Sequence, residues 1–298
     1  MGEDDLTHLD EILELHDLEM DKPAGVKGKD ARQMLNPQKT LKKEPLLYND
    51  DLIGSGYYAE YRTDDARLTI ENIKKAGEYG AVAKNYHKVT GFLFNDGGRI
   101  SGVTVHNEID KTDSHFFAHT VISAAGPWVD DLARLDRPTF KSKLLLSKGV
   151  HVVFPHAKLP VRQSIYFDVS DGRMVFAIPR NQITYVGTTD TFYHGDLNDI
   201  SCTTEDAEYL LKAVNEQFDI PHLGLEDIIS TWAGLRPLIK EEGKNASEVS
   251  RKDEMFESET GLITIAGGRL YFEPTSVVDY MDVVIEEMQA HHGWSAER

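Results

Sequence analysis

The sequence Val121-Ile-Ser-Ala-Ala-Gly-Pro-Trp128 joins a short apolar run to a glycine, a proline and the start of a predicted helix. A second apolar run, residues 262–266, ends in the pair Gly267-Gly268. Short apolar runs bounded by glycine and proline are typical of buried strands. Because a strand that ends in glycine lets the backbone approach a flat or anionic ligand, both ends are candidate ligand contacts.

The residues around these two runs show either helical or strand-like spacing of apolar side chains. Thr203 and Asp206 form a capping-box-like start for a helix whose apolar stripe runs from Ala207 to Phe218. Polar residues 21–43 are predicted as a linker. Further helices are predicted at residues 6–15, 63–80 and 128–135 and from Pro274 onward, and strands at residues 57–58, 81–83, 89–94, 100–105, 115–118, 149–154, 164–167, 174–178, 184–187 and 228–235. The pattern predicts an α+β fold, with helices near both ends of the chain and two strand-rich blocks between them.

Composition and charge exclude several classes of protein. Among 298 residues, 32 Lys+Arg stand against 50 Asp+Glu, and the net charge of −18 argues against a general nucleic-acid binder. A single cysteine, Cys202, rules out intrachain disulfides and cysteine-rich metal sites, and the spacing of the twelve histidines predicts no metal site. The sequence has no apolar run long enough to span a bilayer and begins without a secretory signal, so we expect a cytoplasmic chain.

Three features are candidates for chemistry, and each has a structural alternative. His151 lies in a predicted strand, where it is either a proton acceptor or a half-buried histidine bonded to a backbone carbonyl. Arg236 follows Trp232-Ala-Gly-Leu and is either an anion-binding fork or a surface arginine paired with an acid. The hydroxyls of Gly187-Thr-Thr-Asp190 either orient a ligand or cap a turn, and we favour the structural role.

A dinucleotide-binding loop of the type G-x-G-x-x-G is not found in the sequence. The nearest candidate, Gly54-Ser55-Gly56, is followed by two tyrosines, with no third glycine in register and no predicted helix. On motif grounds, the chain is predicted not to bind FAD or NAD by itself.

Seven sequence blocks occur in the order of a known family. The blocks are Tyr57-Tyr-Ala-Glu-Tyr-Arg-Thr-Asp-Asp-Ala-Arg-Leu-Thr-Ile-Glu71, Ala124-Ala-Gly-Pro-Trp-Val-Asp-Asp131, Lys148-Gly-Val-His-Val-Val153, Asp171-Gly-Arg-Met-Val-Phe-Ala-Ile-Pro-Arg180, Gly187-Thr-Thr-Asp-Thr191, Trp232-Ala-Gly-Leu-Arg-Pro-Leu238 and Ile263-Thr-Ile-Ala-Gly-Gly268. Together they resemble the FAD-dependent, respiratory glycerol-3-phosphate dehydrogenases and the related alpha-glycerophosphate oxidases. Many of the oxidases carry a long insertion after the Leu-Arg-Pro block. Because only residues 240–250 separate that block from Arg251 here, the dehydrogenase is favoured.

The resemblance implies a glutathione-reductase-type FAD domain interleaved with an antiparallel-sheet substrate domain. It implies a partial FAD domain at residues 62–136 and 254–290, a substrate domain at 46–61 and 137–253, an N-terminal helix and linker at 1–45, and a tail at 291–298. FAD would oxidise glycerol 3-phosphate to dihydroxyacetone phosphate and pass electrons to membrane quinone, or to oxygen in the oxidases. The enzyme would then lie at the inner face of the membrane, and the resemblance says nothing of its oligomeric state.

The resemblance also assigns roles to individual residues. His151 matches a candidate base near the substrate hydroxyl, and Arg236 and Arg251 match arginines that hold the phosphate. Gly126, Gly267 and Gly268 match positions where the backbone meets the flavin. Arg269, counted here with the substrate-binding residues, replaces a flavin-facing lysine of the family.

The chain departs from the family pattern in its other parts. The N-terminal strand, glycine loop and helix, with a further catalytic arginine, are not matched, and neither is the C-terminal helical domain. Residues 269–274 read Arg-Leu-Tyr-Phe-Glu-Pro where the family has Lys-Leu-Thr followed by Tyr-Arg. We therefore expect a fragment or truncated form that is inactive alone. The alternatives are an oxidase fragment, a non-catalytic glycerol-phosphate binding module, or a subunit completed in trans.

Overall fold

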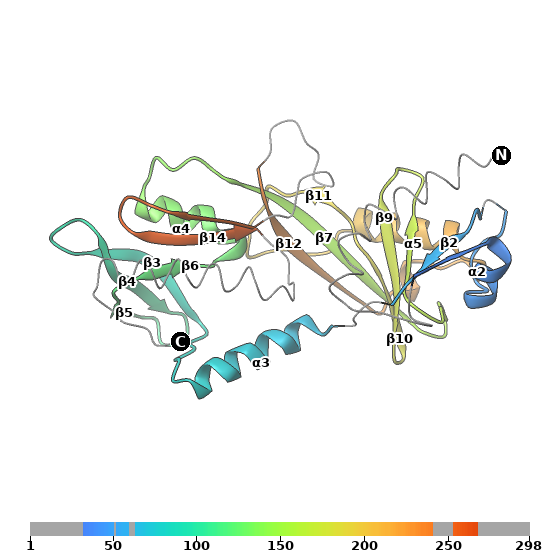
Figure 1. Ribbon diagram of the computed structural model, residues 1–298, viewed down its shortest axis with the longest axis horizontal. Helices are drawn as coiled ribbons and strands as arrows, with labels where there is room; N and C mark the ends of the chain where they lie inside the picture. The colour runs from blue at the N-terminus through green and yellow to red at the C-terminus, as the bar shows by residue number, and fades with distance from the viewer. Residues whose placement is uncertain (1–31, 51, 60–62, 241–252, 268–298) are drawn as a thin grey trace. The chain divides into compact units, whose positions relative to one another are not determined.

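The computed structural model describes residues 32–50, 52–59, 63–240 and 253–267 (Figure 1). The chain divides into two compact units, each assembled from separate stretches of sequence. Unit 1 comprises residues 1–64, 150–189 and 202–232, and unit 2 comprises residues 65–149, 190–201 and 233–298. Both units contain helices and strands, so the predicted mixed architecture is confirmed. The helices expected at residues 6–15 and from Pro274 lie outside the described residues.

A six-stranded sheet forms the centre of unit 1. Its strands follow the order β11-β7-β10-β9-β8, and β12 also pairs with β7. The strands are β7 (Leu144–Pro155), β8 (Ile165–Asp168), β9 (Met174–Arg180), β10 (Ile183–Gly187), β11 (Thr191–Phe192) and β12 (Ser230–Ile239). β7 and β12 continue from unit 1 into unit 2, to which β11 belongs. The antiparallel register places Gly187 of β10 opposite His151 of β7.

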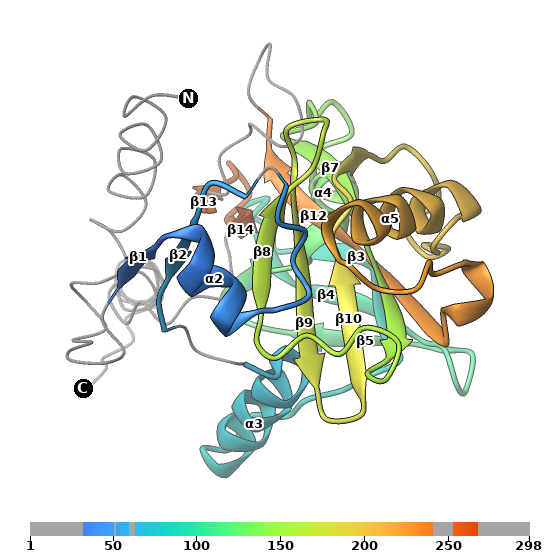
Figure 2. The same ribbon diagram turned by 90° about the vertical axis from the view of Figure 1, so that its right-hand side faces the viewer.

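Helix α5 (Thr204–Gln217) covers one face of this sheet (Figure 2). Its predicted apolar stripe is confirmed, because Ala207, Leu210, Leu211, Val214 and Phe218 are all buried. Alternate residues of β7 supply the other side of the core: Val150, Val152 and Phe154 have no exposed surface. Side chains at the intervening positions of β7, including His151, therefore point to the opposite face of the sheet.

The predicted capping box of α5 is present. The Thr203 hydroxyl accepts a hydrogen bond from the Asp206 amide (3.3 Å), and the Asp206 carboxylate accepts one from the Thr203 amide (2.9 Å). We expect Thr203→Ala to lower the free energy of unfolding by about 1 kcal/mol, because the amide loses its acceptor. Urea denaturation measures the change. Thr204→Ala, one residue into the helix, is the control; an equal loss in both variants would contradict a capping role.

The interpretation of residues 33–43 as a linker is wrong. These residues form strand β1 (Gln33–Leu35), which pairs with β2 (Ser55–Tyr57), and helix α2 (Pro37–Lys43). The Asn36 side chain caps α2 by accepting from the Lys39 amide (3.0 Å), and Pro37 occupies the first helical turn, where its missing N–H costs nothing. Directly after the helix, buried Glu44 accepts the Arg162 amide (2.7 Å).

An ion pair closes the turn between β8 and β9. Arg173 donates to Asp171 from Nε (2.9 Å) and Nη2 (2.5 Å), and this contact holds the pKa of the Asp171 carboxyl below its ordinary value of 3.8. A carboxyl whose folded pKa is depressed stabilises the fold above its unfolded pKa and loses that contribution as the pH falls through the folded pKa. The contribution of Asp171 is therefore complete above about pH 4 and disappears in stronger acid.

We expect Arg173→Gln to raise the pKa of Asp171 toward 3.8 and to narrow the pH range over which this carboxyl stabilises the fold. A carboxyl-detected NMR titration of Asp171 measures the shift. Arg134→Gln removes an arginine from an exposed pair with Asp131 and should leave the titration of Asp171 unchanged. An unchanged titration in Arg173→Gln would show that the Arg173 amide and the Tyr209 hydroxyl, which also donate to Asp171, set the pKa.

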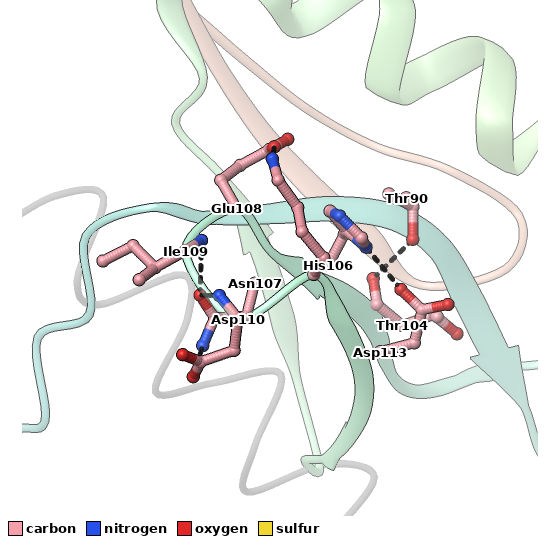
Figure 3. Close-up of polar contacts among 9 residues, drawn as sticks. Thr90, Thr104, His106, Asn107, Glu108, Ile109, Asp110 and Asp113 are labelled. Atoms are coloured by element: carbon pink, nitrogen blue, oxygen red, sulfur yellow. Dashed lines mark hydrogen bonds and ion pairs between the residues drawn. The ribbon is translucent and has the colours of Figure 1, made fainter.

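Unit 2 contains an antiparallel sheet of β3 (His87–Phe94), β4 (Ile100–Asn107) and β5 (Thr112–Phe117). Figure 3 shows the turn between β4 and β5, where the Asn107 side chain accepts from the Ile109 amide (2.9 Å) and donates to Asp110 (2.7 Å). His106 and Asp113 face each other across the strand pair at 2.7 Å. These contacts fix a tight surface turn.

Helix α3 (Asp65–Glu78) forms where the sequence predicts it, but none of its residues is buried. Two of its apolar residues, Ile70 and Ile73, are each 49% exposed. The strand expected at residues 81–83 is wrong, since this stretch is irregular and exposed. Among the helices of the described ranges, none is both long and apolar enough to cross a membrane.

The second sheet of unit 2 joins the two stretches that were predicted as apolar strands ending in glycine. β6 (Val121–Ser123) pairs in parallel with β14 (Leu262–Gly267), which also pairs antiparallel with β13 (Asp253–Glu257). A single-turn helix η2 (Gly126–Trp128) and helix α4 (Val129–Asp136) follow β6; a comparable turn in unit 1 is η3 (Leu225–Asp227). Val129, Leu144 and Ala266 form the core beside this sheet.

Candidate functional site

The carboxyl ends of β6 and β14 lie at the same edge of their sheet, because the two strands are parallel. Val121 pairs with Leu262 and Ser123 with Thr264, so the glycines that follow, Gly126 and Gly267, leave the strands at this edge. We call this pair of strand ends the glycine edge. Both strands were predicted from their apolar runs and are confirmed; Gly268 lies outside the described residues.

Both glycines of the edge have backbone conformations that favour glycine. Their φ angles are +55° at Gly126 and +77° at Gly267, values at which a side chain would be strained. A Cβ placed on Gly126 would meet no described atom within 4 Å, so open space lies directly beside the backbone. This arrangement fits a flat ring system such as a flavin, which needs close backbone approach.

In unit 1, His151 lies on the sheet face opposite α5 and is half-buried. Its imidazole stacks on the indole of Trp232, with centroids 4.6 Å apart and an interplanar angle of 12°. The phenol of Tyr185 meets the imidazole at a steep angle (centroids 6.1 Å apart, 61°) and lies 5.3 Å from the indole. Neither Trp232 nor Tyr185 was predicted as a site residue from the sequence, although Trp232 begins one of the seven blocks.

Gly187 provides the space in which the imidazole lies. A Cβ on Gly187 would come within 2.3 Å of Cδ2 and 2.7 Å of Nε2 of His151, distances that no side chain tolerates. Thr189, two residues later, accepts the Val150 amide through its buried hydroxyl (3.0 Å). For Thr189, the structural role favoured from the sequence is thus supported.

In unit 2, Arg236 is paired with an acid. Its Nη1 lies 3.6 Å from Oδ1 of Asp190, which also accepts a hydrogen bond from the Ser147 hydroxyl. The Arg236 side chain is 23% exposed, so it is neither a free surface cation nor a buried one. The acid partner expected in the structural interpretation of Arg236 is therefore present, while part of its side chain stays open to solvent.

The structure places the predicted residues in separate groups. Gly126 and Gly267 share the glycine edge of unit 2, Arg236 belongs to the Asp190 pair of the same unit, and His151 belongs to the aromatic group of unit 1. Arg251 and Arg269 lie outside the described residues. The contacts among Asp190, Ser147 and Arg236 could not be found from spacing alone, since they join three segments distant in sequence.

Comparison with known proteins identifies the class. The family described as FAD dependent oxidoreductase matches residues 3–269, so the chain belongs to the FAD-dependent oxidoreductases. Over 278 residues it is 47% identical to the aerobic glycerol-3-phosphate dehydrogenase of Staphylococcus epidermidis. The aligned region covers 93% of this chain and 50% of the relative. The chain therefore spans about half the length of the curated relatives that it matches.

Solved structures agree with this result. The glycerol-3-phosphate dehydrogenase from Bacillus halodurans, complexed with FAD, superposes with a TM-score of 0.78 at 46% identity, covering 86% of this chain and 49% of that one. The L-alpha-glycerophosphate oxidase from Mycoplasma pneumoniae, with FAD bound, superposes with a TM-score of 0.55 at 18% identity, covering 94% and 69%. This second likeness shows the fold alone.

Proposed function

We propose that this chain is the substrate-binding and flavin-facing part of an FAD-dependent glycerol-3-phosphate dehydrogenase. The observation that carries the proposal is the glycine edge, in which two parallel strands of a chain 47% identical to such enzymes end in glycines with positive φ. The dehydrogenase is preferred to the oxidase because of the short segment after the Leu-Arg-Pro block. Quinone would be the electron acceptor.

The work would be divided between a cofactor part and a substrate part of the chain. Residues 62–136 and 254–290, which carry the glycine edge, would be a partial FAD domain of the glutathione-reductase type. Residues 46–61 and 137–253, which carry the antiparallel sheet, His151 and Arg236, would be the substrate domain, interleaved with it in the sequence. Gly126, Gly267 and Gly268 would place backbone against the ring system. The dinucleotide phosphates would be held by residues that this sequence does not contain.

The side chains named above match what oxidation of a secondary alcohol requires. When bound, FAD would supply the acceptor for the hydride that leaves C2 of glycerol 3-phosphate. As the C2–H bond breaks, the hydroxyl proton must leave as well, and His151 accepts it, so that the product is the ketone dihydroxyacetone phosphate. Arg236 and Arg251 would bind the phosphate through charge-assisted hydrogen bonds, and Arg269 would be a further substrate-binding residue.

Two measurements on the purified chain test this function. We expect saturable binding of glycerol 3-phosphate, followed by NMR, and much weaker binding of glycerol, which lacks the phosphate. We also expect a colourless protein after incubation with excess FAD and desalting, because the phosphate loop is missing from the sequence. Failure to bind glycerol 3-phosphate would overturn the substrate assignment. A retained flavin that glycerol 3-phosphate bleaches would overturn the expectation that the chain is inactive alone.

A further inference from the structure

His151 does not stand alone on its strand. Its imidazole is covered on one face by the indole of Trp232 at 4.6 Å, and Tyr185 approaches both rings. Offset or parallel contacts between aromatic rings contribute about 0.5–1.5 kcal/mol beyond the burial of surface. The three rings come from three adjacent strands, β7, β10 and β12, so the contact depends on the sheet being assembled.

Two observations distinguish this group from ordinary core packing. Trp232 is 45% exposed, whereas the core of unit 1 lies on the opposite face, among Val150, Val152 and Phe154. Gly187, directly opposite His151 in the register, has no side chain where any Cβ would collide with the imidazole. The sheet therefore keeps a space for this ring on the face opposite α5 and covers the ring with an indole that itself stays accessible.

We propose that Trp232 is a positioning residue for His151, and that it acts together with the space at Gly187 to hold the imidazole in one orientation. A histidine on a sheet that is not held by its neighbours samples several side-chain rotamers. Stacking on the indole and lying over Gly187 select one of them before any ligand arrives. The catalytic consequence rests on the proposed function. A proton acceptor that is already oriented toward the substrate hydroxyl does not lose conformational entropy when the substrate binds.

The test measures the position of the ring without flavin or substrate. In the chain labelled with 13C-histidine, the ring C–H signals of His151 are assigned by their disappearance in His151→Gln. Because the imidazole lies on the face of an indole, these signals are expected well upfield of the average histidine. Trp232→Leu should remove most of that displacement, and Trp232→Phe should restore much of it, since an aromatic face is regained.

Two further variants serve as controls. Trp128→Leu removes a comparably exposed indole from η2 in unit 2 and should leave the His151 signals unchanged. Gly187→Ala should move them, because the new methyl occupies the space of the imidazole. Far-UV circular dichroism establishes that each variant is folded. If Trp232→Leu does not fold, the displacement of the His151 signals in Trp232→Phe still tests the positioning role.

The possible results distinguish the positioning role of Trp232 from the proposed substrate of the chain. His151 signals that stay in place in Trp232→Leu, or that are not displaced in the parent chain, would overturn the positioning role. Displaced signals in a chain that binds no glycerol 3-phosphate would support the positioning role and overturn the proposed substrate. Turnover in a flavin-loaded enzyme is not needed for either result.

Discussion

Replacing Arg236 with alanine is expected to weaken the binding of glycerol 3-phosphate by about ten- to one-hundred-fold. A hydrogen bond between charged partners contributes roughly 1.5–3 kcal/mol, and each 1.4 kcal/mol is a factor of ten in affinity. Arg236 is partly open to solvent and held by Asp190 at 3.6 Å, so it can contact a phosphate without first being ordered. NMR titration of the purified chain measures the dissociation constant.

Arg236→Lys and Arg134→Ala complete this experiment. Lysine keeps the charge but not the planar fork, so an intermediate loss is expected. Arg134 lies in the same unit and pairs with Asp131 at 2.9 Å on the surface of α4; its removal changes the net charge equally and should leave binding unchanged. If Arg134→Ala and Arg236→Ala weaken binding to the same extent, the effect comes from overall charge and Arg236 does not bind the phosphate.

Replacing Phe218 with alanine is expected to lower the free energy of unfolding by about 3–5 kcal/mol. Phe218 is the C-cap residue of α5, has no exposed surface and meets the ring of Phe167 edge-on, with centroids 5.4 Å apart. Its backbone also bridges to Leu47, which connects the segment after α2 to the end of the helix. The loss combines the transfer of a large ring to water with the cavity left behind.

Urea denaturation measures the loss, and the m-value is expected to stay unchanged. Phe117→Ala is the matched control. Phe117 ends β5 and is 77% exposed, so removing the same ring there should change stability by no more than about 0.5 kcal/mol. A loss at Phe218 below about 1 kcal/mol would mean that the core of unit 1 closes around the missing ring.

Local signals in the sequence predicted some elements well. The Thr203–Asp206 capping box and the apolar stripe after it define α5, because capping and helical periodicity act within one or two turns. The runs that became β6 and β14 were recognised in the same way, from apolar residues bounded by glycine. Helix α2 was missed because its lysine-rich sequence was interpreted as a polar linker, although Asn36-Pro37 is an equally local signal for the start of a helix.

Other features depend on contacts that no local pattern contains. The stacking of Trp232 on His151 needs the register of a sheet, and alternation predicts only which side of the strand a residue occupies. The pairing of Arg236 with Asp190 joins segments about 45 residues apart in the sequence, and an acidic chain offers many equivalent partners. The apolar positions of α3 were correctly read as helical, yet amphipathic spacing does not reveal whether a neighbour covers that face.

The parallel pairing of β6 with β14 has a consequence for the order in which the protein folds. About 140 residues of chain separate Val121 from its partner Leu262. During synthesis, β6 leaves the ribosome long before β14 exists, whereas the hairpins of β3, β4 and β5 can close at once. The glycine edge is therefore among the last features to assemble, and until then the apolar β6 is a strand without its partner, exposed to other nascent chains and to chaperones.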